Sequence, residues 1–451
     1  MGKKKEKERS LASSFASNTA WQIAQQIYSM FISLVIGAVS ARYLGPSNYG
    51  LLNYGTSLIN LMTTLTALGL DEVVMNDLVR DVDSRNEIIG TALVMRLVAS
   101  VCGIFAIMSI VMALEPNNKL LWTVTFLQSF QLIGNLYHVY NYWYQVELKS
   151  KFVSIAFIIG LTCASIWRVV MLIKNADVRF FALTASIQSL VVLAVVIVCF
   201  KREAHMRLKW NCGRAKSLLS RSYHFIISAI AIMIYMQMDK IMIGKMLGEE
   251  PLGYYSAASM VANLWLFVPR ALINSARPIV LEGKNVESEG DESEYHNRLA
   301  KLVFGMILLG VLVGIAFTVF GKLIVMIMYG KKYAPAVPAL YILIWASGLA
   351  QLGSVNGIWI ASEGYNKWLK YTTFFGAFVN LGLNYILIGK IGITGAAIAT
   401  LVAQFSVQFI APLFFRELRQ YYVIYGMALK EIKNVKYYVV YACDKIKSKK
   451  K

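Results

Sequence analysis

The chain has 451 residues, of which 57% are hydrophobic and 16% are charged, and its mean hydropathy is +0.55. Soluble domains carry about 25% charged residues because their surfaces face water, so this composition excludes an ordinary soluble protein. The net charge of +20 does not indicate nucleic-acid binding, because the lysines and arginines gather at the termini and between apolar runs, a distribution typical of membrane topology signals.

Apolar segments long enough to cross a bilayer recur along the whole chain. A membrane helix needs roughly 20 mainly apolar residues, and short connections with turn residues, such as 45–48 (GPSN) and 115–118 (EPNN), separate the segments. The sequence therefore predicts an all-α membrane protein with about 12 transmembrane helices. The predicted spans cover about residues 17–43, 47–69, 88–113, 119–143, 152–173, 178–200, 222–246, 251–275, 300–328, 335–361, 367–388 and 393–415.

The basic residues predict the orientation of these spans. Lysine and arginine are frequent in 1–16, 201–221 and 416–451, and scarce in the opposite connections. Because cytoplasmic loops carry this excess, we expect both termini in the cytoplasm. The N-terminus is too polar for a cleavable signal peptide. The aromatic and lysine-rich tail is predicted to lie on the inner leaflet, with a disordered tail as the alternative for its last eight residues.

A repeat divides the spans into two groups of six. Leu44, Gly45, Gly50 and Asn60 recur as Leu247, Gly248, Gly253 and Asn263 with one constant offset. Six spans per half preserve the orientation, so the halves would be two lobes related by a pseudo-twofold axis along the membrane normal. The predicted domains are a basic N-terminus (1–16), an N-lobe (17–200), a basic cytoplasmic linker (201–221), a C-lobe (222–415) and a basic tail (416–451).

Charged side chains inside the spans give the strongest functional signal. Arg96, Arg168, Lys240 and Arg270 lie within predicted spans, against a single acid, Asp239. Each cation costs about 2.5–3.5 kcal/mol at the bilayer centre, so these side chains are expected to face water or a visiting anion. For Arg270, near a helix end, snorkelling is an equal alternative. Asp239 is the candidate for ion coupling.

Polar stripes on several spans extend this prediction. Such stripes either bond helices together, at about 0.6 kcal/mol per contact, or line a cavity, and both alternatives are open for any single stripe. Because stripes occur in both halves, we expect a shared wet interior. The candidate substrate-binding residues are Arg96, Arg168, Arg270, Asn18, Gln22, Gln25, Asn60, Gln128, Asn135, Asn263 and Asn380.

Several motifs are missing from the sequence. It contains no phosphate-binding G-x-x-x-x-G-K-[ST] loop, so ATP is not expected to be the direct fuel, and no H-E-x-x-H or G-x-S-x-G motif. Its five cysteines include no C-x-x-C pair, so neither a metal site nor a disulfide framework is indicated. We therefore expect no catalytic residues, no cofactor and no metal, with an ion gradient or the substrate's own gradient as the energy source.

Five segments resemble a known family in order along the chain. They are 41–50 (ARYLGPSNYG), 238–244 (MDKIMIG), 253–258 (GYYSAA), 329–334 (YGKKYA) and 392–397 (GITGAA). They are similar to motifs of the polysaccharide biosynthesis proteins, which are oligosaccharide repeat-unit flippases in the multidrug/oligosaccharidyl-lipid/polysaccharide exporter superfamily. The resemblance implies a two-lobed bundle, a V-shaped central cavity and alternating access. It carries Asp239 over as a motif residue.

The resemblance and the buried cations together predict a flippase. Its substrate would be a polyprenyl-pyrophosphate-linked oligosaccharide of O-antigen, capsule or exopolysaccharide, moved from the inner to the outer leaflet of a bacterial cytoplasmic membrane. Expected partners are this substrate, membrane lipids and a polysaccharide polymerase or glycosyltransferase complex. The alternatives are a multidrug cation exporter, which the cationic interior disfavours, a membrane-embedded polymerase or glycosyltransferase, and a structural partner in such a complex.

Overall fold

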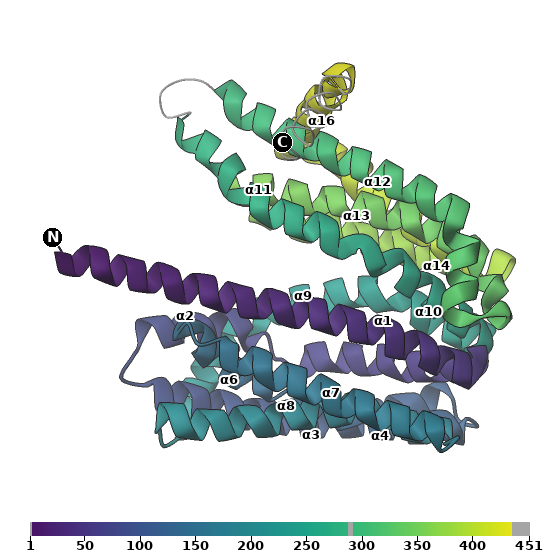
Figure 1. The fold of residues 1–451 in the computed structure, drawn as a ribbon, viewed down its shortest axis with the longest axis horizontal. Coiled ribbons are helices and arrows are strands. Elements are labelled where there is room, and N and C mark those ends of the chain that lie inside the picture. Colours follow the sequence, from purple (N-terminus) through teal and green to yellow (C-terminus); the bar gives the residue numbers. More distant parts are fainter. Residues whose placement is uncertain (1, 287–291, 435–451) are drawn as a thin grey trace, which may run out of the picture. The chain divides into compact units, whose positions relative to one another are not determined.

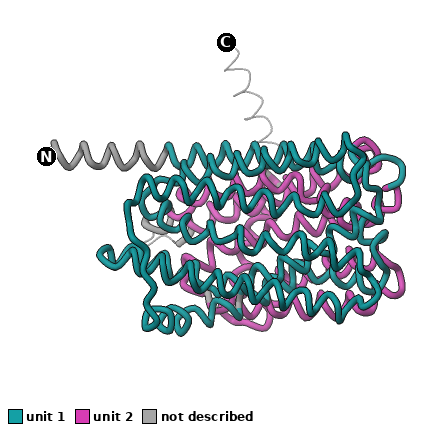
Figure 2. Tube along the Cα trace, turned by 90° about the horizontal axis from the view of Figure 1, so that it is seen from below, with its two compact units in different colours: residues 1–253, 328–332 teal, residues 254–327, 333–451 magenta. Residues whose placement is uncertain are grey.

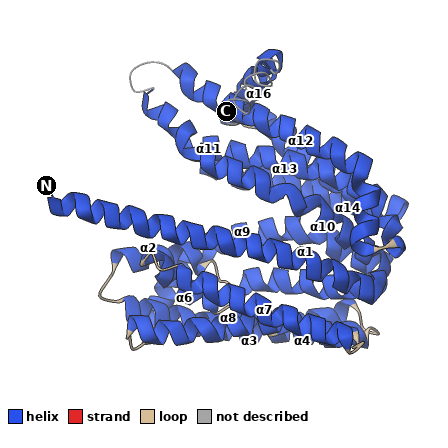
Figure 3. Ribbon diagram, in the orientation of Figure 1, coloured by secondary structure: helices blue, strands red, loops and turns tan. Residues whose placement is uncertain are grey.

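The structure, a computed structural model, describes residues 2–286 and 292–434, with helices as its regular elements (Figures 1 and 3). Within these ranges no strand occurs. The predicted all-α fold class is therefore confirmed.

Figure 1 labels most of the elements. The α-helices are α1 (Gly2–Thr66), α2 (Leu70–Arg80), α3 (Arg85–Leu114), α4 (Lys119–Ser129), α5 (Gln131–Gly134), α6 (Tyr137–Val146), α7 (Lys151–Ile173), α8 (Val178–Ala204), α9 (Cys212–Leu247), α10 (Glu249–Asn263), α11 (Phe267–Val286), α12 (Glu292–Tyr329), α13 (Val337–Ser362), α14 (Asn366–Phe405), α15 (Ala411–Phe414) and α16 (Gln420–Lys430).

Two of the long helices contain a backbone break where the sequence predicts a turn. In α1, Gly45 has φ 73° and ψ 172°, a combination essentially restricted to glycine, and Pro46 follows without a backbone N–H to donate. In α14, Gly392 has φ 63°. Each of these helices therefore holds two of the predicted spans.

Nine helical stretches of the described chain are long and apolar enough to cross a membrane, by length and composition alone. Two of them, Ser17–Arg80 and Lys367–Phe414, each contain two predicted spans. The predicted span 119–143 is interrupted, because the chain leaves the helix at Phe130 and again after Gly134, where glycine and asparagine are weak helix formers. The predicted number of twelve spans stays a prediction.

The chain forms two compact units, coloured separately in Figure 2. Unit 1 comprises residues 1–253 and 328–332, and unit 2 comprises residues 254–327 and 333–451. Helix α9 belongs to unit 1 because it packs along α1, α2 and α3. The division thus falls within α10 and not at the basic linker. The predicted lobes 17–200 and 222–415, and their pseudo-twofold axis, stay predictions.

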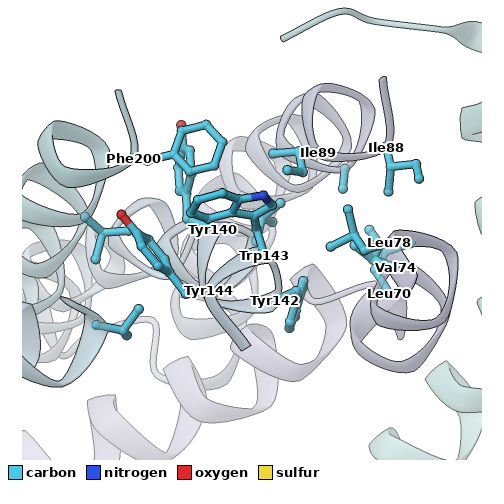
Figure 4. Packing of buried hydrophobic residues seen from close by; sticks show 14 of the residues in the cluster. Leu70, Val74, Leu78, Ile88, Ile89, Tyr140, Tyr142, Trp143, Tyr144 and Phe200 are labelled. Carbon is cyan, nitrogen blue, oxygen red and sulfur yellow. The ribbon is translucent and has the colours of Figure 1, made fainter. Parts of the chain in front are cut away.

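An aromatic core fixes α2, α3, α6 and α8 against one another in unit 1 (Figure 4). Trp143 meets Phe200 edge to face, with ring centroids 5.1 Å apart, a favourable geometry for aromatic pairs. Leu70 and Ile88 are fully buried in the same cluster. The first turn of α2 is consequently held beside α3 and α6.

The two copies of the sequence repeat meet at their glycines. Gly248 has φ 92°, as Gly45 has a positive φ. A Cβ atom on Gly50 would collide with the Glu249 carbonyl, and one on Gly253 would collide with the Pro46 carbonyl. The contact is reciprocal, so each copy needs glycine where the backbone of the other approaches it.

Ion pairs hold the basic linker against other residues of unit 1, in α2 and directly after it. Arg221 Nη2 lies 2.6 Å from Asp77 Oδ2, and Arg214 Nη2 lies 3.0 Å from Asp81 Oδ2. The Lys209 amide also donates to the Asn86 carbonyl at 3.2 Å. Two of the seven lysines and arginines in the linker, Arg214 and Arg221, are therefore neutralised within the unit.

Candidate functional site

Arg96 is buried on α3 and forms an ion pair. Only 5% of the residue is exposed, and its Nη2 lies 2.6 Å from Asp71 Oδ1. The Tyr142 hydroxyl donates to the same carboxylate, and the Tyr142 ring lies 5.6 Å from the guanidinium carbon. This guanidinium is therefore neutralised by the protein itself.

The Arg96 pair borders a cavity of about 500 Å³ in unit 1, which we call the Arg96 cavity. Asn135 and His138 line it, as do Asn141 and Gln145 on α6. Asp71 was not among the predicted site residues, because it follows the end of the second predicted span at residue 69. The first turn of α2 instead brings the carboxylate back to α3.

A second cavity of unit 1, of about 310 Å³, lies between α1, α6 and α7, and we call it the amide cavity. Its polar groups are mainly carboxamides: Gln22, Gln25 and Gln26 from α1, and Asn141 and Gln145 from α6. None of the described residues that line it is charged. The structure thus brings together Gln22 and Gln25, both predicted, with Gln26, Asn141 and Gln145, which were not among the candidate substrate-binding residues. Asn141 and Gln145 line the Arg96 cavity as well.

Arg168 has no ion-pair partner in the described ranges, and its Nε is buried without a hydrogen-bond acceptor. It lines a third cavity of unit 1, of about 110 Å³, together with Ser33 and Gln188. A pocket for a drug-sized ligand has about 300–1,000 Å³. This cavity is therefore too small for a sugar pyrophosphate, although it can hold water or a small ion.

Unit 2 has a cavity of about 300 Å³ against α11, which we call the arginine cavity. Arg270, Asn274 and Arg277 line it from one face of the helix, at spacings of four and three residues. Ser354 and Gly357 of α13 line it from the other side. Neither arginine has an ion-pair partner in the part of the chain that the structure describes, and no acid lines the cavity.

Arg277 and Asn274 were not among the predicted site residues. The predicted span ended at residue 275, so Arg277 was counted as part of a loop. Helix α11 in fact continues to Val286. The spacing of Arg270, Asn274 and Arg277 could have revealed the shared face.

The other predicted polar residues line none of these four cavities. Most make bonds within or between helices: Asn18 Nδ2 donates to the Leu148 carbonyl, Gln128 Nε2 to the Leu52 carbonyl at 3.1 Å, Asn263 Nδ2 to the Ser259 carbonyl at 2.8 Å, and Asn384 Nδ2 to Asn380 Oδ1 at 3.0 Å. Asn60 is half-buried, and its carbonyl accepts from Thr64 Oγ1 at 3.3 Å. Bonding between helices thus accounts for part of the polar stripes.

Asp239 lies on α9, with 8% of the residue exposed. It stands one turn after Tyr235 and directly before Lys240. It lines none of the four cavities described above. Its role in ion coupling stays a proposal.

Comparison with known proteins identifies the relatives of this chain. The profile of a family described as polysaccharide biosynthesis protein matches residues 39–338. The probable low-salt glycan biosynthesis flippase Agl15 of Haloferax volcanii is 26% identical over 186 residues, which is 41% of this chain and 39% of that relative. The putative O-antigen transporter of Escherichia coli K12 is 21% identical over 397 residues, covering 83% of this chain and 90% of the relative.

Solved structures share the fold. The lipid II flippase MurJ in an inward closed conformation aligns with a TM-score of 0.70 at 13% identity, covering 95% of this chain and 93% of that one. An inward-facing MATE multidrug transporter of the MOP superfamily aligns with a TM-score of 0.68 at 14% identity, covering 88% and 96% of the two chains. The family match confirms the resemblance noted in the sequence, and the chain shares the fold of these two transporters.

Proposed function

Because the chain belongs to the polysaccharide biosynthesis protein family and has a transporter fold, not that of a catalytic enzyme, we propose that it is a flippase for a polyprenyl-pyrophosphate-linked oligosaccharide. The substrate would move from the inner to the outer leaflet of a bacterial cytoplasmic membrane. The relatives named as a glycan biosynthesis flippase and an O-antigen transporter support this substrate class. Both termini would lie in the cytoplasm, and the lobes would alternate access around a central cavity.

The arginine cavity is the observation that carries the proposal. Two guanidinium groups without carboxylate partners in the described chain, Arg270 and Arg277, line one cavity with Asn274. Guanidinium groups bind phosphate oxygens in bidentate geometry, and unpaired cations are costly near a membrane unless an anion visits them. A pyrophosphate supplies that anion. Multidrug cation export is disfavoured, since the same charges repel a cation.

Arg96 takes a different place in this proposal from the one the sequence suggested. Its guanidinium already has a carboxylate at 2.6 Å, so a phosphate must first displace Asp71. Arg270 and Arg277 meet no such competition from the described residues. We therefore assign the pyrophosphate to the arginine cavity and keep Asp239 as the ion-coupling candidate.

Reconstitution of the full chain into vesicles tests the function. The probe is a fluorescent undecaprenyl-pyrophosphate oligosaccharide, whose passage between leaflets is followed by a membrane-impermeant quencher. Each hydrogen bond to a charged group contributes about 1.5–3 kcal/mol, so Arg270→Ala with Arg277→Ala should slow the passage at least about a hundredfold. The control is Lys301→Ala with Lys322→Ala, two exposed cations of unit 2 outside the cavity.

Two results would count against the proposal. If wild-type vesicles do not move the probe under any ion gradient, the chain is not such a flippase. If the wild type moves it and the double arginine variant moves it equally fast, the pyrophosphate is bound elsewhere. New glycosidic bonds in the recovered probe would favour an enzyme.

A further inference from the structure

We propose that the amide cavity binds uncharged sugar residues of the transported substrate. This inference rests on the proposed flippase function and assigns a second part of the substrate, since the pyrophosphate is placed in unit 2. Its basis is a set of unused hydrogen-bonding groups around a cavity without charge.

The carboxamides of the cavity have no hydrogen-bond partners within residues 2–286 and 292–434. Gln22, Gln25, Gln26, Asn141 and Gln145 make no side-chain hydrogen bond with any other residue that the structure describes. Each carboxamide offers two N–H donors and an oxygen with two lone pairs. A ligand that satisfies several of them must itself both donate and accept at short intervals. Sugar hydroxyl groups have this property, whereas a phosphate only accepts and an ammonium only donates.

The absence of charge around the cavity selects against ionic ligands. Among the lining residues in the described part of the chain, Tyr137 alone is ionisable. The neighbouring Arg96 cavity contains a cation, but Asp71 neutralises it at 2.6 Å. An acidic sugar or a phosphate would therefore lose its hydration here without gaining a counter-charge, and a neutral polyol would not.

Aromatic side chains complete the lining. Tyr137 and Phe157 line the cavity beside the amides, and small-molecule sites typically combine apolar and aromatic surface with a few convergent polar groups. A sugar ring presents a C–H face that packs on such surface while its hydroxyls reach the amides. The volume of about 310 Å³ gives room for only a small part of an oligosaccharide.

Helix α6 connects this cavity with the next one. Asn141 and Gln145 stand one turn apart and line both the amide cavity and the Arg96 cavity. Asn135 and His138 continue the polar lining in the Arg96 cavity. A sugar chain held by Asn141 and Gln145 thus has polar surface on both sides of the helix.

A binding comparison with two carriers tests the sugar site. The probes are undecaprenyl pyrophosphate carrying a single N-acetylhexosamine and the same carrier with a neutral tetrasaccharide, bound to the purified full chain in detergent. Neutral hydrogen bonds contribute about 0.5–1.5 kcal/mol each. Asn141→Leu with Gln145→Leu should therefore weaken tetrasaccharide binding about tenfold and leave the single-sugar carrier unchanged.

Two further variants protect the test against a folding defect. Gln22→Leu lies on α1, on the opposite wall of the cavity, is exposed, and should weaken the tetrasaccharide carrier about threefold. Gln131→Leu on α5 is the same substitution outside these cavities and should change neither affinity.

The outcomes separate this inference from the proposed function. Equal wild-type affinities for the two carriers, or equal losses of both in the double variant, would overturn the sugar site. The sugar site would also be overturned if a neutral diglycosyl-diacylglycerol bound more tightly than the tetrasaccharide carrier in a Gln145-dependent way. The occupant of the cavity would then be a membrane glycolipid. If the sugar advantage is present but vesicles show no translocation, the flippase function fails and the sugar site stands. If vesicles show translocation but the tetrasaccharide carrier binds no more tightly than the single-sugar carrier, the flippase function stands and the sugar site fails.

Discussion

The Arg96 cavity and the arginine cavity both contain guanidinium groups, but they differ in whether a carboxylate of the described chain pairs with them. In unit 1, Arg96 is almost completely buried and lies 2.6 Å from the Asp71 carboxylate. In unit 2, Arg270 and Arg277 are exposed to their cavity and have no carboxylate partner in the described chain.

This difference distinguishes a charged group that holds helices together from charged groups that are available to bind a ligand. Arg96 is buried, and a buried charge is costly without its partner, so its pair with Asp71, whose side chain is 59% exposed, is expected to hold α2 against α3. An exposed pair of like charges adds no stability, since the two cations repel each other. Its presence in one cavity is consistent with the anionic ligand proposed above. Arg168 is intermediate, because it is unpaired in the described chain but borders a cavity of only about 110 Å³.

The largest expected effect comes from placing a partner in the arginine cavity. Arg277→Glu would pair with Arg270 and make this cavity resemble the Arg96 cavity. We expect passage of the pyrophosphate carrier in vesicles to fall about a hundredfold or more, since two charge-assisted contacts are lost. The melting temperature should hardly change, because Arg277 is exposed. Lys301→Glu on α12 is the matched charge reversal, and it should retain the wild-type rate.

The next prediction removes a carboxylate partner instead of adding one, and it concerns the Arg96–Asp71 ion pair of unit 1. Asp71→Ala leaves a buried guanidinium without its carboxylate and should lower the free energy of unfolding by about 1–3 kcal/mol, measured by denaturation in micelles. Arg96→Met with Asp71→Leu removes both members and should recover most of that loss. If the double variant is stable but does not transport, Arg96 acts on the substrate, and the contrast between the two cavities is wrong.

The sequence predicted the helices and the turn at Gly45, because apolar length and a glycine–proline pair are local signals. It did not predict that Asp71 reaches Arg96, because that contact depends on where α2 begins after the left-handed Gly69. The predicted span end at residue 275 likewise hid Arg277, although the polar face of α11 continues past it. Polar residues such as Gln128 could not be divided into lining and helix contacts without the packing of their neighbours.

A smaller effect concerns the neutral polar contact that docks α16 in unit 2. Asn356 Nδ2 donates to the Tyr425 hydroxyl at 2.6 Å and to Gln408 Oε1 at 2.9 Å. Tyr425→Phe removes one of these bonds and should lower the free energy of unfolding by about 1 kcal/mol. Tyr371→Phe, at an exposed position of α14, should have no effect in the same denaturation series.

The same contact should depend on alkaline pH. Burial raises the pKa of Tyr425 to about 12, above its ordinary value of 10.0. The neutral hydroxyl therefore contributes its full stability below about pH 10, and this contribution is lost as the pH rises toward 12. The Phe variant lacks the group, so the stability difference from wild type should shrink over that interval. If the stability difference between wild type and Tyr425→Phe stayed constant from pH 10 to 12, the pKa of Tyr425 would be the same in the folded and unfolded states, and the prediction would be wrong.

The smallest expected effect lies at the edge of unit 1, where the paired side chains of Arg214 and Asp81 are partly exposed to water. The hydrogen bond from Arg214 lowers the pKa of Asp81 below its ordinary 3.8, so the pair is intact above that value and is lost as the pH falls through the lowered pKa. Asp81→Asn imitates the protonated state at neutral pH. Because surface ion pairs are weak, we expect hydrogen exchange in residues 209–215 to rise only about two- to fivefold. Asp83→Asn, in the same loop but without a described ion pair, should leave the exchange unchanged. A global loss of protection in the Asp81 variant would mean that exposed pairs of unit 1 are as structural as Arg96–Asp71.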